Sequence, residues 1–206
     1  MSRCVIVGGA DISDYSAVKT CFKADDFFIF CDCGLKHLVP LCVKPDLLVG
    51  DFDSYKAQRP ECETIVLPCE KDDTDTVYAV KEAMKRGFDD FLLIGVFGGR
   101  LDHTLGNVSI LAYLDSFNKH CKALDDFCEA EILSREPVSI PDSFSCFSLL
   151  NVFGPAKGIN IENAKYPLKD GEITCEYQYG ISNEVIKGKT ARVSVRDGRL
   201  LLIKNR

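Results

Sequence analysis

The 206-residue sequence has no tryptophan and no Cys-x-x-Cys pair, and it contains only two methionines and three histidines. Its eleven cysteines are an odd number and lack the spacing typical of zinc sites, which argues against both structural zinc and a disulfide framework. No nearby histidine or helix start marks one thiol as an activated nucleophile. We therefore interpret the cysteines as reduced thiols that pack as small hydrophobic side chains.

The sequence also lacks a basic excess and a long apolar run. Its net charge is -6, which argues against a nucleic-acid-binding surface because such a surface needs a basic face. No apolar run reaches the length of a membrane-spanning helix, and the start, MSRCVIVG, is too short for a signal peptide. We expect a globular cytoplasmic protein that binds neither nucleic acid nor membranes.

Three short strings rich in aspartate stand out from this background. They cover residues 50–54 (GDFDS), 71–75 (KDDTD) and 98–103 (GGRLDH), and each stands where an apolar run meets a turn or a helix start. Magnesium takes oxygen ligands, usually one or two carboxylates together with phosphates and waters. The strings therefore predict a magnesium and polyphosphate site, although the same residues are also common in turns and helix caps.

The apolar runs before these strings place them in a fold. On an extended backbone Asp51 and Asp53 would project from one face, with Cβ atoms about 6 to 7 Å apart, and Phe52 would point into the core. The runs before Asp51 and before Gly98 resemble buried strands, and open α/β sheets bind ligands at the carboxyl ends of their strands. We expect both strings to lie on one edge of one sheet.

The first part of the chain alternates such runs with helical patterns, which predicts an α/β domain with a parallel, Rossmann-like sheet and crossover helices. The expected strands cover residues 4–7, 27–31, 47–49, 64–67 and 91–96. One expected helix covers residues 74–86, with an apolar stripe of Val77, Val80 and Met84, Ala83 beside it, and a stop at Gly87. Another begins at Asp102 and ends near residue 118.

After residue 124 the pattern changes to short alternating runs broken by Gly, Pro and Asn, with no convincing helix. This spacing predicts a C-terminal all-β sandwich. The expected strands cover residues 144–152, 159–161, 171–179, 191–195 and 199–203. We therefore divide the chain into domains at residues 1–124 and 125–206.

Taken together, the motifs resemble those of the thiamine pyrophosphokinase family over nearly the whole chain. The family's strings appear in order as Asp32-Cys33-Gly34, Pro45-Asp46, GDFDS, KDDTD, GGRLDH and Gly106-Asn107, followed in the second part by KYPL at 165–168 and GISNE at 180–184. Two positions depart from the family pattern. Cys33 stands where the family usually has glycine, and Phe97 stands where a small or hydroxyl residue is common.

This resemblance implies that the chain transfers the diphosphate of ATP to the hydroxyl of thiamine, giving thiamine diphosphate and AMP, with Mg²⁺ as cofactor. It implies that residues 1–124 form the ATP- and magnesium-binding catalytic domain. It further implies that residues 125–206 bind thiamine and support a homodimer with its thiamine pocket between subunits.

Matched residue by residue, the family pattern also assigns roles. The expected catalytic residues are Asp51, Asp53, Asp75, Asp102 and Arg100, with Asp51, Asp53 and Asp75 as magnesium ligands. The expected nucleotide contacts are Asp32, Gly34, Lys71, Asp72, Thr74, Gly98, Gly99, His103 and Asn107, and the expected thiamine contacts are Ser182 and Asn183. Arg100 offers a planar fork for phosphate oxygens. Asp102 would complete the metal shell or orient the hydroxyl.

Several of these residues also have ordinary structural explanations. Thr74 could cap a helix, Lys71 could be a solvated loop lysine, and His103 could be a structural residue on the same helix face as Asn107. Tyr177 and Tyr179, two apart on an expected strand, are candidate walls for thiamine, but sheet packing explains them as well. The glycines at 8 and 9 lack the full dinucleotide-binding string.

Two other functions remain open from the sequence. A pyrophosphokinase that acts on another alcohol, such as a hydroxymethylpterin, would share the aspartate-rich half, and the string at residues 180–184 argues against it. A non-catalytic nucleotide or thiamine sensor would not need all four carboxylates, Asp51, Asp53, Asp75 and Asp102, which are present here.

Overall fold

The structure is a computed structural model that describes residues 2–53 and 59–206, so Ser54 of the GDFDS string lies outside the described residues. The chain divides into two compact units, Met1–Asp126 and Phe127–Arg206. From the sequence, this boundary was expected after residue 124. Each unit has its own hydrophobic core.

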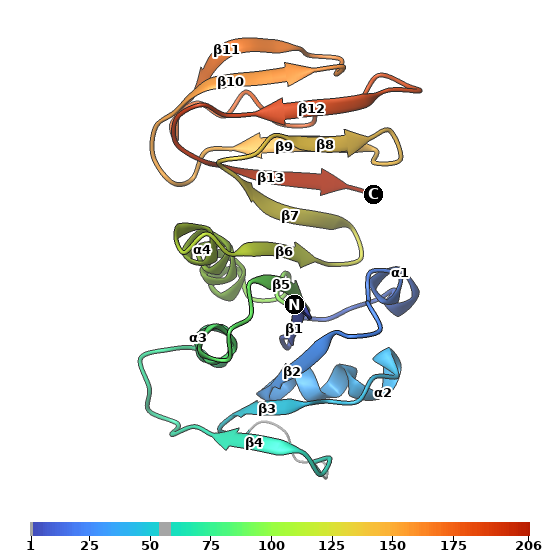
Figure 1. The fold of residues 1–206 in the computed structure, drawn as a ribbon, viewed down its shortest axis with the longest axis vertical. Coiled ribbons are helices and arrows are strands. Elements are labelled where there is room, and N and C mark those ends of the chain that lie inside the picture. Colours follow the sequence, from blue (N-terminus) through green and yellow to red (C-terminus); the bar gives the residue numbers. More distant parts are fainter. Residues whose placement is uncertain (1, 54–58) are drawn as a thin grey trace. The chain divides into compact units, whose positions relative to one another are not determined.

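The first unit is built on a parallel sheet in the order β4-β3-β2-β1-β5-β6 (Figure 1). Its strands are β1 (Cys4–Val7), β2 (Phe27–Cys31), β3 (Leu47–Gly50), β4 (Glu63–Val66), β5 (Asp90–Ile94) and β6 (His120–Leu124). All except β6 were expected from the sequence. β1 is apolar and buried along its whole length, as expected of a strand whose two faces are both covered.

Helices cover the two faces of this sheet. They are α1 (Tyr15–Lys19), the 3₁₀ helix η1 (Asp32–His37), α2 (Leu38–Leu41), α3 (Asp75–Lys85) and α4 (Leu101–Ser116). Val18, Leu35 and Leu41, from α1, η1 and α2, join one core cluster with side chains of β1, β2, β3 and β5. In Figure 1, α3 and α4 lie on the other side of the sheet from α1 and α2.

The buried face of α3 differs from the expected stripe. Ala79, Val80 and Ala83 are buried, whereas Val77 and Met84 are only half-buried. α3 packs on β1, β2 and β3. Small side chains on this face let the helix backbone approach the sheet closely. The expected pattern included Val80 and Ala83 but missed Ala79.

The strand register aligns the carboxyl ends of neighbouring strands with one another. Val7 at the end of β1 pairs with Phe30 of β2 and Ile94 of β5, and Gly50 at the end of β3 pairs with Val66 of β4. Because all these strands are parallel, the segments that follow them emerge at the same edge of the sheet. The three aspartate-rich strings lie in those segments, as expected.

The second unit contains only strands, all antiparallel. They are β7 (Cys128–Leu133), β8 (Val138–Pro141), β9 (Cys146–Leu150), β10 (Ala156–Glu162), β11 (Leu168–Ile173), β12 (Thr190–Ser194) and β13 (Leu200–Asn205). β13 pairs with β7 and β9, while the other four form a sheet in the order β11-β10-β12-β8. β7 and β8 were not expected from the sequence.

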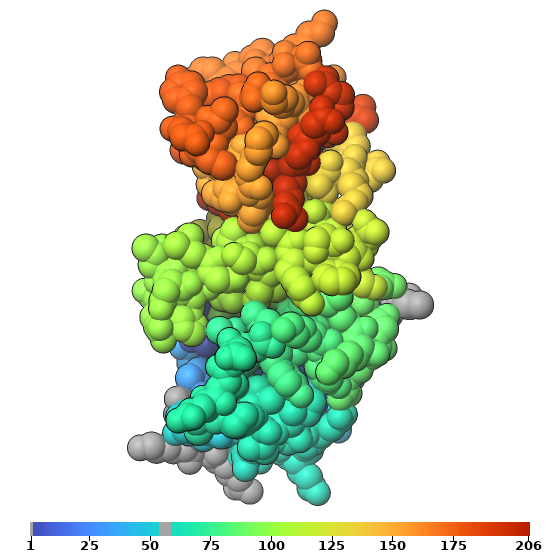
Figure 2. All heavy atoms as spheres, turned by 90° about the vertical axis from the view of Figure 1, so that its left-hand side faces the viewer, coloured from blue at the N-terminus to red at the C-terminus, as the bar shows by residue number. Residues whose placement is uncertain are grey.

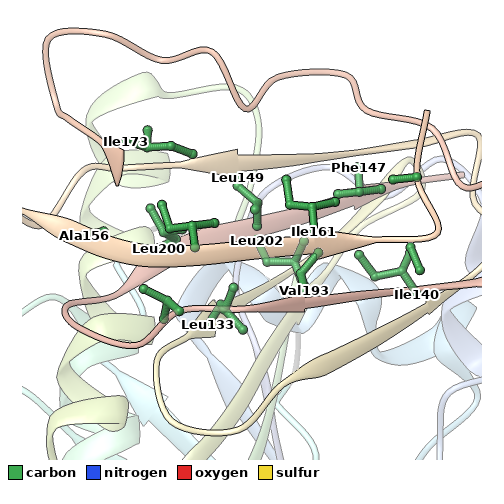
Figure 3. Close-up of a cluster of buried hydrophobic side chains, with 14 residues drawn as sticks. Leu133, Ile140, Phe147, Leu149, Ala156, Ile161, Ile173, Val193, Leu200 and Leu202 are labelled. Carbon is green, nitrogen blue, oxygen red and sulfur yellow. The ribbon is translucent and has the colours of Figure 1, made fainter. Parts of the chain in front are cut away.

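Both sets of strands contribute to one hydrophobic core (Figure 3). Leu133 and Leu202, from β7 and β13, are fully buried in the same cluster as Ile140 and Val193, from β8 and β12. Phe147 of β9, also fully buried, is among the largest of these side chains. The alternation of inward apolar and outward polar residues is the pattern of sheets that cover one another on one face.

The expected strand at residues 171–179 is wrong beyond Ile173. Residues 174–180 form a loop, because side chains take over the hydrogen bonds that a strand would make. The amide of Gln178 donates to the carbonyls of Asn151 (2.6 Å) and Cys175 (3.1 Å), and its oxygen accepts from the Asn151 backbone amide (2.9 Å). Tyr177 and Tyr179 therefore do not share a strand face.

Among the described residues no helix combines the length and the hydropathy needed to cross a membrane.

Candidate active site

The ends of β2 and β3 bring Asp32 beside the Asp51–Asp53 turn. Asp32 directly follows β2, and Gly50 ends β3 immediately before Asp51. A Cβ atom added at Gly50 would lie 2.8 Å from the Cβ of Asp32, a distance that real side chains do not tolerate. Glycine at position 50 is thus what allows the two strand ends, and their carboxylates, to approach each other.

The backbone between Asp51 and Asp53 is not extended, so the expected geometry is wrong. Phe52 adopts a left-handed conformation with φ 59°, which is rare for a bulky residue. The Asp53 amide donates to Oδ1 of Asp51 (3.3 Å), an Asx-type turn that stabilises this conformation. The Phe52 ring is half-buried against the hydrophobic core of the first unit. The guanidinium carbon of Arg59 lies 4.7 Å from the centroid of this ring.

The turn still places the two carboxylates together. Ligand atoms of Asp51, Asp53 and Cys69 all lie within 4.8 Å of one another. Cys69 comes from the segment after β4, and the sequence analysis did not include it in the site. Only the distance between two separate segments identifies this thiol.

Lys71 lies between two of the expected magnesium ligands. Its Nζ atom is 2.8 Å from Asp51 Oδ2 and 2.9 Å from Asp75 Oδ1. Burial alone would lower the pKa of Lys71, but the hydrogen bonds to Asp51 and Asp75 outweigh it and raise that pKa to about 12. The hydrogen bond from Lys71 also lowers the pKa of Asp51. Lys71 is therefore a charged part of the cluster and not a solvated loop lysine.

Asp32 is the buried acid of the cluster. Its Oδ2 accepts a hydrogen bond from the Cys33 thiol (3.4 Å), whereas its buried Oδ1 has no hydrogen-bond partner in the described part of the chain. Burial raises the pKa of Asp32, and the charges of Asp51, Asp75 and Asp53 raise it further. A buried carboxylate oxygen without a donor, surrounded by other acids, fits a site for a cation.

We expect Asp32→Asn to stabilise the metal-free protein by about 1 to 3 kcal/mol at pH 7, because asparagine has nearly the same shape and removes a buried charge that Asp51, Asp53 and Asp75 repel. The folded pKa of Asp32 lies above its unfolded value of about 3.9. Below that unfolded pKa the carboxyl is protonated in both states and does not lower the stability. As the pH rises, the unfolded state ionises first, and the folded protein loses stability. Urea unfolding of both proteins should show the difference at pH 7 and little of it near the unfolded pKa. A variant less stable than the wild type at pH 7 would contradict this assignment.

The remaining residues of the KDDTD string lie around the start of α3. Thr74 caps this helix, because its Oγ1 accepts a hydrogen bond from the Val77 amide (3.3 Å). Asp73 forms an ion pair with Lys81 (2.6 Å), and the side chain of Asp72 is exposed. In Figure 1 this segment leads from the edge strand β4 back to α3, and Figure 2 shows α3 and the preceding residues at the surface in teal.

The GGRLDH string forms an exposed turn, Gly98–Arg100, and the first residues of α4. Gly98 and Gly99 have φ values of 97° and 68°, a left-handed conformation that favours glycine. The Arg100 guanidinium donates to both carboxylate oxygens of Asp102 (3.2 and 2.6 Å), which lowers the pKa of Asp102. The hydroxyl of Thr104, a residue not expected in the site, stabilises the turn with two hydrogen bonds. It accepts one from the Gly98 amide and donates one to the Arg100 carbonyl (both 3.1 Å).

His103 and Asn107 occupy different environments on α4. His103 is exposed, whereas Asn107 is buried and donates from Nδ2 to the Val96 carbonyl (2.7 Å). This bond fastens α4 to the segment after β5. The structure thus gives Asn107 a fixed structural contact and leaves His103 at the surface.

Gly34 lies where two chain segments almost touch. A Cβ atom at Gly34 would be 2.2 Å from the Val7 carbonyl oxygen, and one at Gly9 would be 2.5 Å from the Cβ of Cys33. The segment at residues 32–34 therefore packs directly on the turn after β1. Cys33 is exposed, but its Cβ takes part in this contact, and Gly9 leaves the room for it.

In the second unit the GISNE string is held by Asn183. Its Oδ1 accepts from the backbone amides of Tyr166 (3.0 Å) and Glu184 (2.9 Å), and its Nδ2 donates to the Tyr166 carbonyl (2.8 Å). Asn183 is buried and structurally engaged, while Ser182 beside it is exposed with φ 56°. The rings of Tyr177 and Tyr179 are exposed, with centroids 5.5 Å apart.

Comparison with known proteins identifies the family of this chain. The sequence profile described as "Thiamin pyrophosphokinase, catalytic domain" matches residues 18–123, more than half of the chain. The chain belongs to the thiamin pyrophosphokinase family. A second profile, "Thiamin pyrophosphokinase, vitamin B1 binding domain", matches residues 136–200. The catalytic match contains the three aspartate-rich strings, and the vitamin B1 match contains the GISNE string.

Individual thiamin pyrophosphokinases agree with this result. The thiamine pyrophosphokinase of Bacillus subtilis is 27% identical over 214 residues, covering 98% of this chain and 97% of the relative. The crystal structure of thiamin pyrophosphokinase from Geobacillus thermodenitrificans has a TM-score of 0.84 at 25% identity, covering 99% of this chain and 97% of its own. Thiamin pyrophosphokinase from Candida albicans shares the fold, with a TM-score of 0.77 at 13% identity over 99% and 88% of the chains.

The resemblance seen in the sequence is therefore confirmed, and with it the enzyme class, thiamine diphosphokinase. Membership in the thiamin pyrophosphokinase family makes thiamine and ATP the substrates.

Proposed function

We propose that this chain performs the thiamin pyrophosphokinase reaction with the carboxylates at the ends of β2, β3 and β4 as its metal and polyphosphate site. The observation that carries this proposal is the convergence of four acids, Asp32, Asp51, Asp53 and Asp75. Two of them, Asp51 and Asp75, hold Lys71 between them. So many acids at one sheet edge oppose folding by mutual repulsion unless a cation compensates them. A binding requirement accounts for their presence.

The donor set fits Mg²⁺, which is held by carboxylate oxygens together with substrate phosphates. Asp51, Asp53 and Asp75 would hold the ion, and the unpartnered Oδ1 of Asp32 supports a cation at this place. When bound, Mg²⁺ would neutralise phosphate charge and stabilise the transition state of transfer. Lys71, which now contacts Asp51, would be free to bind a phosphate oxygen when that carboxylate holds the ion.

The glycine-rich turns and Arg100 complete the proposed nucleotide site. The strand order reverses between β1 and β5, and Rossmann-like sheets bind nucleotides at such a switch point. Gly8 and Gly9 follow β1 at this point, and Gly98 and Gly99 follow β5. The guanidinium of Arg100 is exposed and is oriented by its two hydrogen bonds to the Asp102 carboxylate. Its planar set of donors is suited to bind phosphate oxygens.

We propose that the second unit supplies the thiamine contacts. Ser182 offers an exposed hydroxyl, and Tyr177 and Tyr179 offer exposed rings for the pyrimidine. Asn183 would act by positioning Ser182 and Tyr166, because its own amide is engaged. We further propose a homodimer in which the second unit of one copy faces the aspartate site of its partner, which the mass in solution would test.

A cytoplasmic location also remains a proposal. None of the eleven cysteines, all of which lie in the described part of the chain, forms a disulfide bond, and reduced thiols persist in a reducing compartment.

Ser182→Ala should raise the KM for thiamine about fivefold, the loss of one hydrogen bond of about 1 kcal/mol, and leave the KM for ATP unchanged. Steady-state kinetics with each substrate varied in turn measures the two values. Ser139→Ala, which removes another exposed hydroxyl of the second unit, is the matched control. Equal losses for both substrates would count against a thiamine site at Ser182.

The direct test of the function is to incubate the purified protein with ATP, Mg²⁺ and thiamine and to quantify the products. AMP and thiamine diphosphate should form in equal amounts, and only when all three components are present. Transfer to a hydroxymethylpterin but not to thiamine would support the other pyrophosphokinase. Binding of ATP without any transfer would support a sensor.

A further inference from the structure

The Asp51–Asp53 turn has a third potential metal ligand in the thiol of Cys69. Ligand atoms of the three side chains lie within 4.8 Å of one another. Asp51 and Asp53 follow β3, and Cys69 follows the adjacent parallel strand β4, whose last residue, Val66, pairs with Gly50. Two neighbouring strand ends therefore hold the three ligands in place.

The thiol of Cys69 is available for binding. It is exposed, and it has no hydrogen-bond partner among residues 2–53 and 59–206. Other exposed cysteines are engaged: the thiol of Cys33 donates to Asp32, that of Cys42 to the Val39 carbonyl, and that of Cys175 to Asn151. Cys69 therefore differs from these thiols in two ways: its thiol has no hydrogen-bond partner in the described part of the chain, and it lies beside two carboxylates.

A second observation points independently to a cation here. The carboxylate of Asp32 is about nine-tenths buried, with 6% of the residue exposed, and its Oδ1 has no hydrogen-bond donor in the described part of the chain. Asp32 packs beside the start of the Asp51–Asp53 turn, because a Cβ atom at Gly50 would lie 2.8 Å from the Cβ of Asp32. A cation at the Asp51–Asp53 turn would compensate this buried charge.

The chemistry of the donors decides which cations fit. Mg²⁺ requires oxygen ligands in octahedral geometry and gains nothing from sulfur. Zn²⁺ takes cysteine sulfur together with carboxylate oxygens, usually with four ligands, and soft thiolates favour such ions over Mg²⁺. On binding, the metal–sulfur bond replaces the S–H bond, and the proton is released to solvent.

We propose that Asp51, Asp53 and Cys69 bind Zn²⁺ and that this ion competes with Mg²⁺ and inhibits the enzyme. Zn²⁺ held by two carboxylates and a thiolate has one open position left of its usual four. Zn²⁺ would thus bind two of the proposed magnesium ligands, Asp51 and Asp53, and would leave fewer coordination positions for phosphate oxygens than Mg²⁺ does. The inhibition rests on the proposed function, whereas the metal binding does not.

Metal binding can be tested without substrates by titrating the protein with Co²⁺, the spectroscopic substitute for Zn²⁺. The wild type should develop the charge-transfer absorption of a Co²⁺–thiolate bond, and Cys69→Ser should lack it. Cys175→Ser, which removes another exposed thiol, is the matched control and should keep the absorption. Isothermal titration calorimetry with Zn²⁺ should show at least about tenfold weaker binding to Cys69→Ser than to the wild type. Absorption that persists in Cys69→Ser would overturn the proposal.

The inhibition is measured separately, relative to the activity of each protein in Mg²⁺ alone. The Zn²⁺ concentration that halves thiamine diphosphate formation should rise at least about tenfold in Cys69→Ser, in line with the weaker binding. Equal sensitivity of the two proteins would overturn the inhibitory role. A protein that shows the cobalt–thiolate absorption but forms no thiamine diphosphate would disprove the proposed function and leave the metal site supported.

Discussion

Asp53→Asn is expected to lower kcat for thiamine diphosphate formation by about 10³-fold, with the fold preserved. Loss of one preorganised electrostatic group typically costs 10²- to 10³-fold, and Asp53 is in addition a proposed metal ligand. Its side chain is exposed, so asparagine of nearly the same shape should leave the first core intact. Steady-state kinetics over a range of Mg²⁺ concentrations, together with circular dichroism, measures both effects.

The matched control for this change is Asp89→Asn. Asp89 precedes β5 and therefore lies at the amino end of the strands, at the opposite edge of the same sheet from the carboxylate cluster. Its carboxylate forms an ion pair with Lys119. We expect this variant to keep kcat within about twofold, since exposed ion pairs contribute little. Near-normal activity of a folded Asp53→Asn protein would remove Asp53 from the metal site.

Gly34→Ala is expected to destabilise the protein by about 2 to 3 kcal/mol and to impair ATP use. The new Cβ would lie 2.2 Å from the Val7 carbonyl oxygen and 3.1 Å from that of Gly8, and both are backbone atoms that cannot rotate away. Forcing extra volume into a packed region typically costs 1 to 3 kcal/mol. The turn after β1, where we place the nucleotide, would have to shift.

Gly106→Ala provides the opposite expectation within the same unit. Gly106 lies inside α4, and a Cβ atom there would meet no atom of the described structure within 4 Å. Alanine should stabilise the helix by about 0.5 to 1 kcal/mol, because glycine is the more flexible residue in the unfolded chain. Urea unfolding of Gly34→Ala, Gly106→Ala and the wild type measures the two changes in stability. Equal stability of Gly34→Ala and the wild type would show that the two segments are not in close contact.

The sequence predicted most strands of the first unit because their signal is simple. β1, β2 and β3 are short apolar runs bounded by turn residues, and both faces of each run are covered. The signal fails where a buried position is charged. Glu131 of β7 is buried in an ion pair with Lys204 of β13 (2.8 Å), so the alternation of β7 does not look apolar. β8 has only four residues and ends at a proline.

The candidate site was predictable in its composition but not in its contacts. The aspartates were found because each string follows a strand, and parallel strands bring such strings to one edge. The bridging position of Lys71 and the proximity of Cys69 depend on distances between segments, which no string shows. The left-handed Phe52 was missed because alternating residues were assumed to be extended.

Diphosphate transfer to thiamine can be followed with the terminal phosphate of γ-labelled ATP. If the whole diphosphate moves, the label appears in thiamine diphosphate in step with unlabelled AMP, and Asp53→Asn loses both products together. Label in thiamine monophosphate with ADP as the second product, or label only in inorganic phosphate, would contradict this transfer.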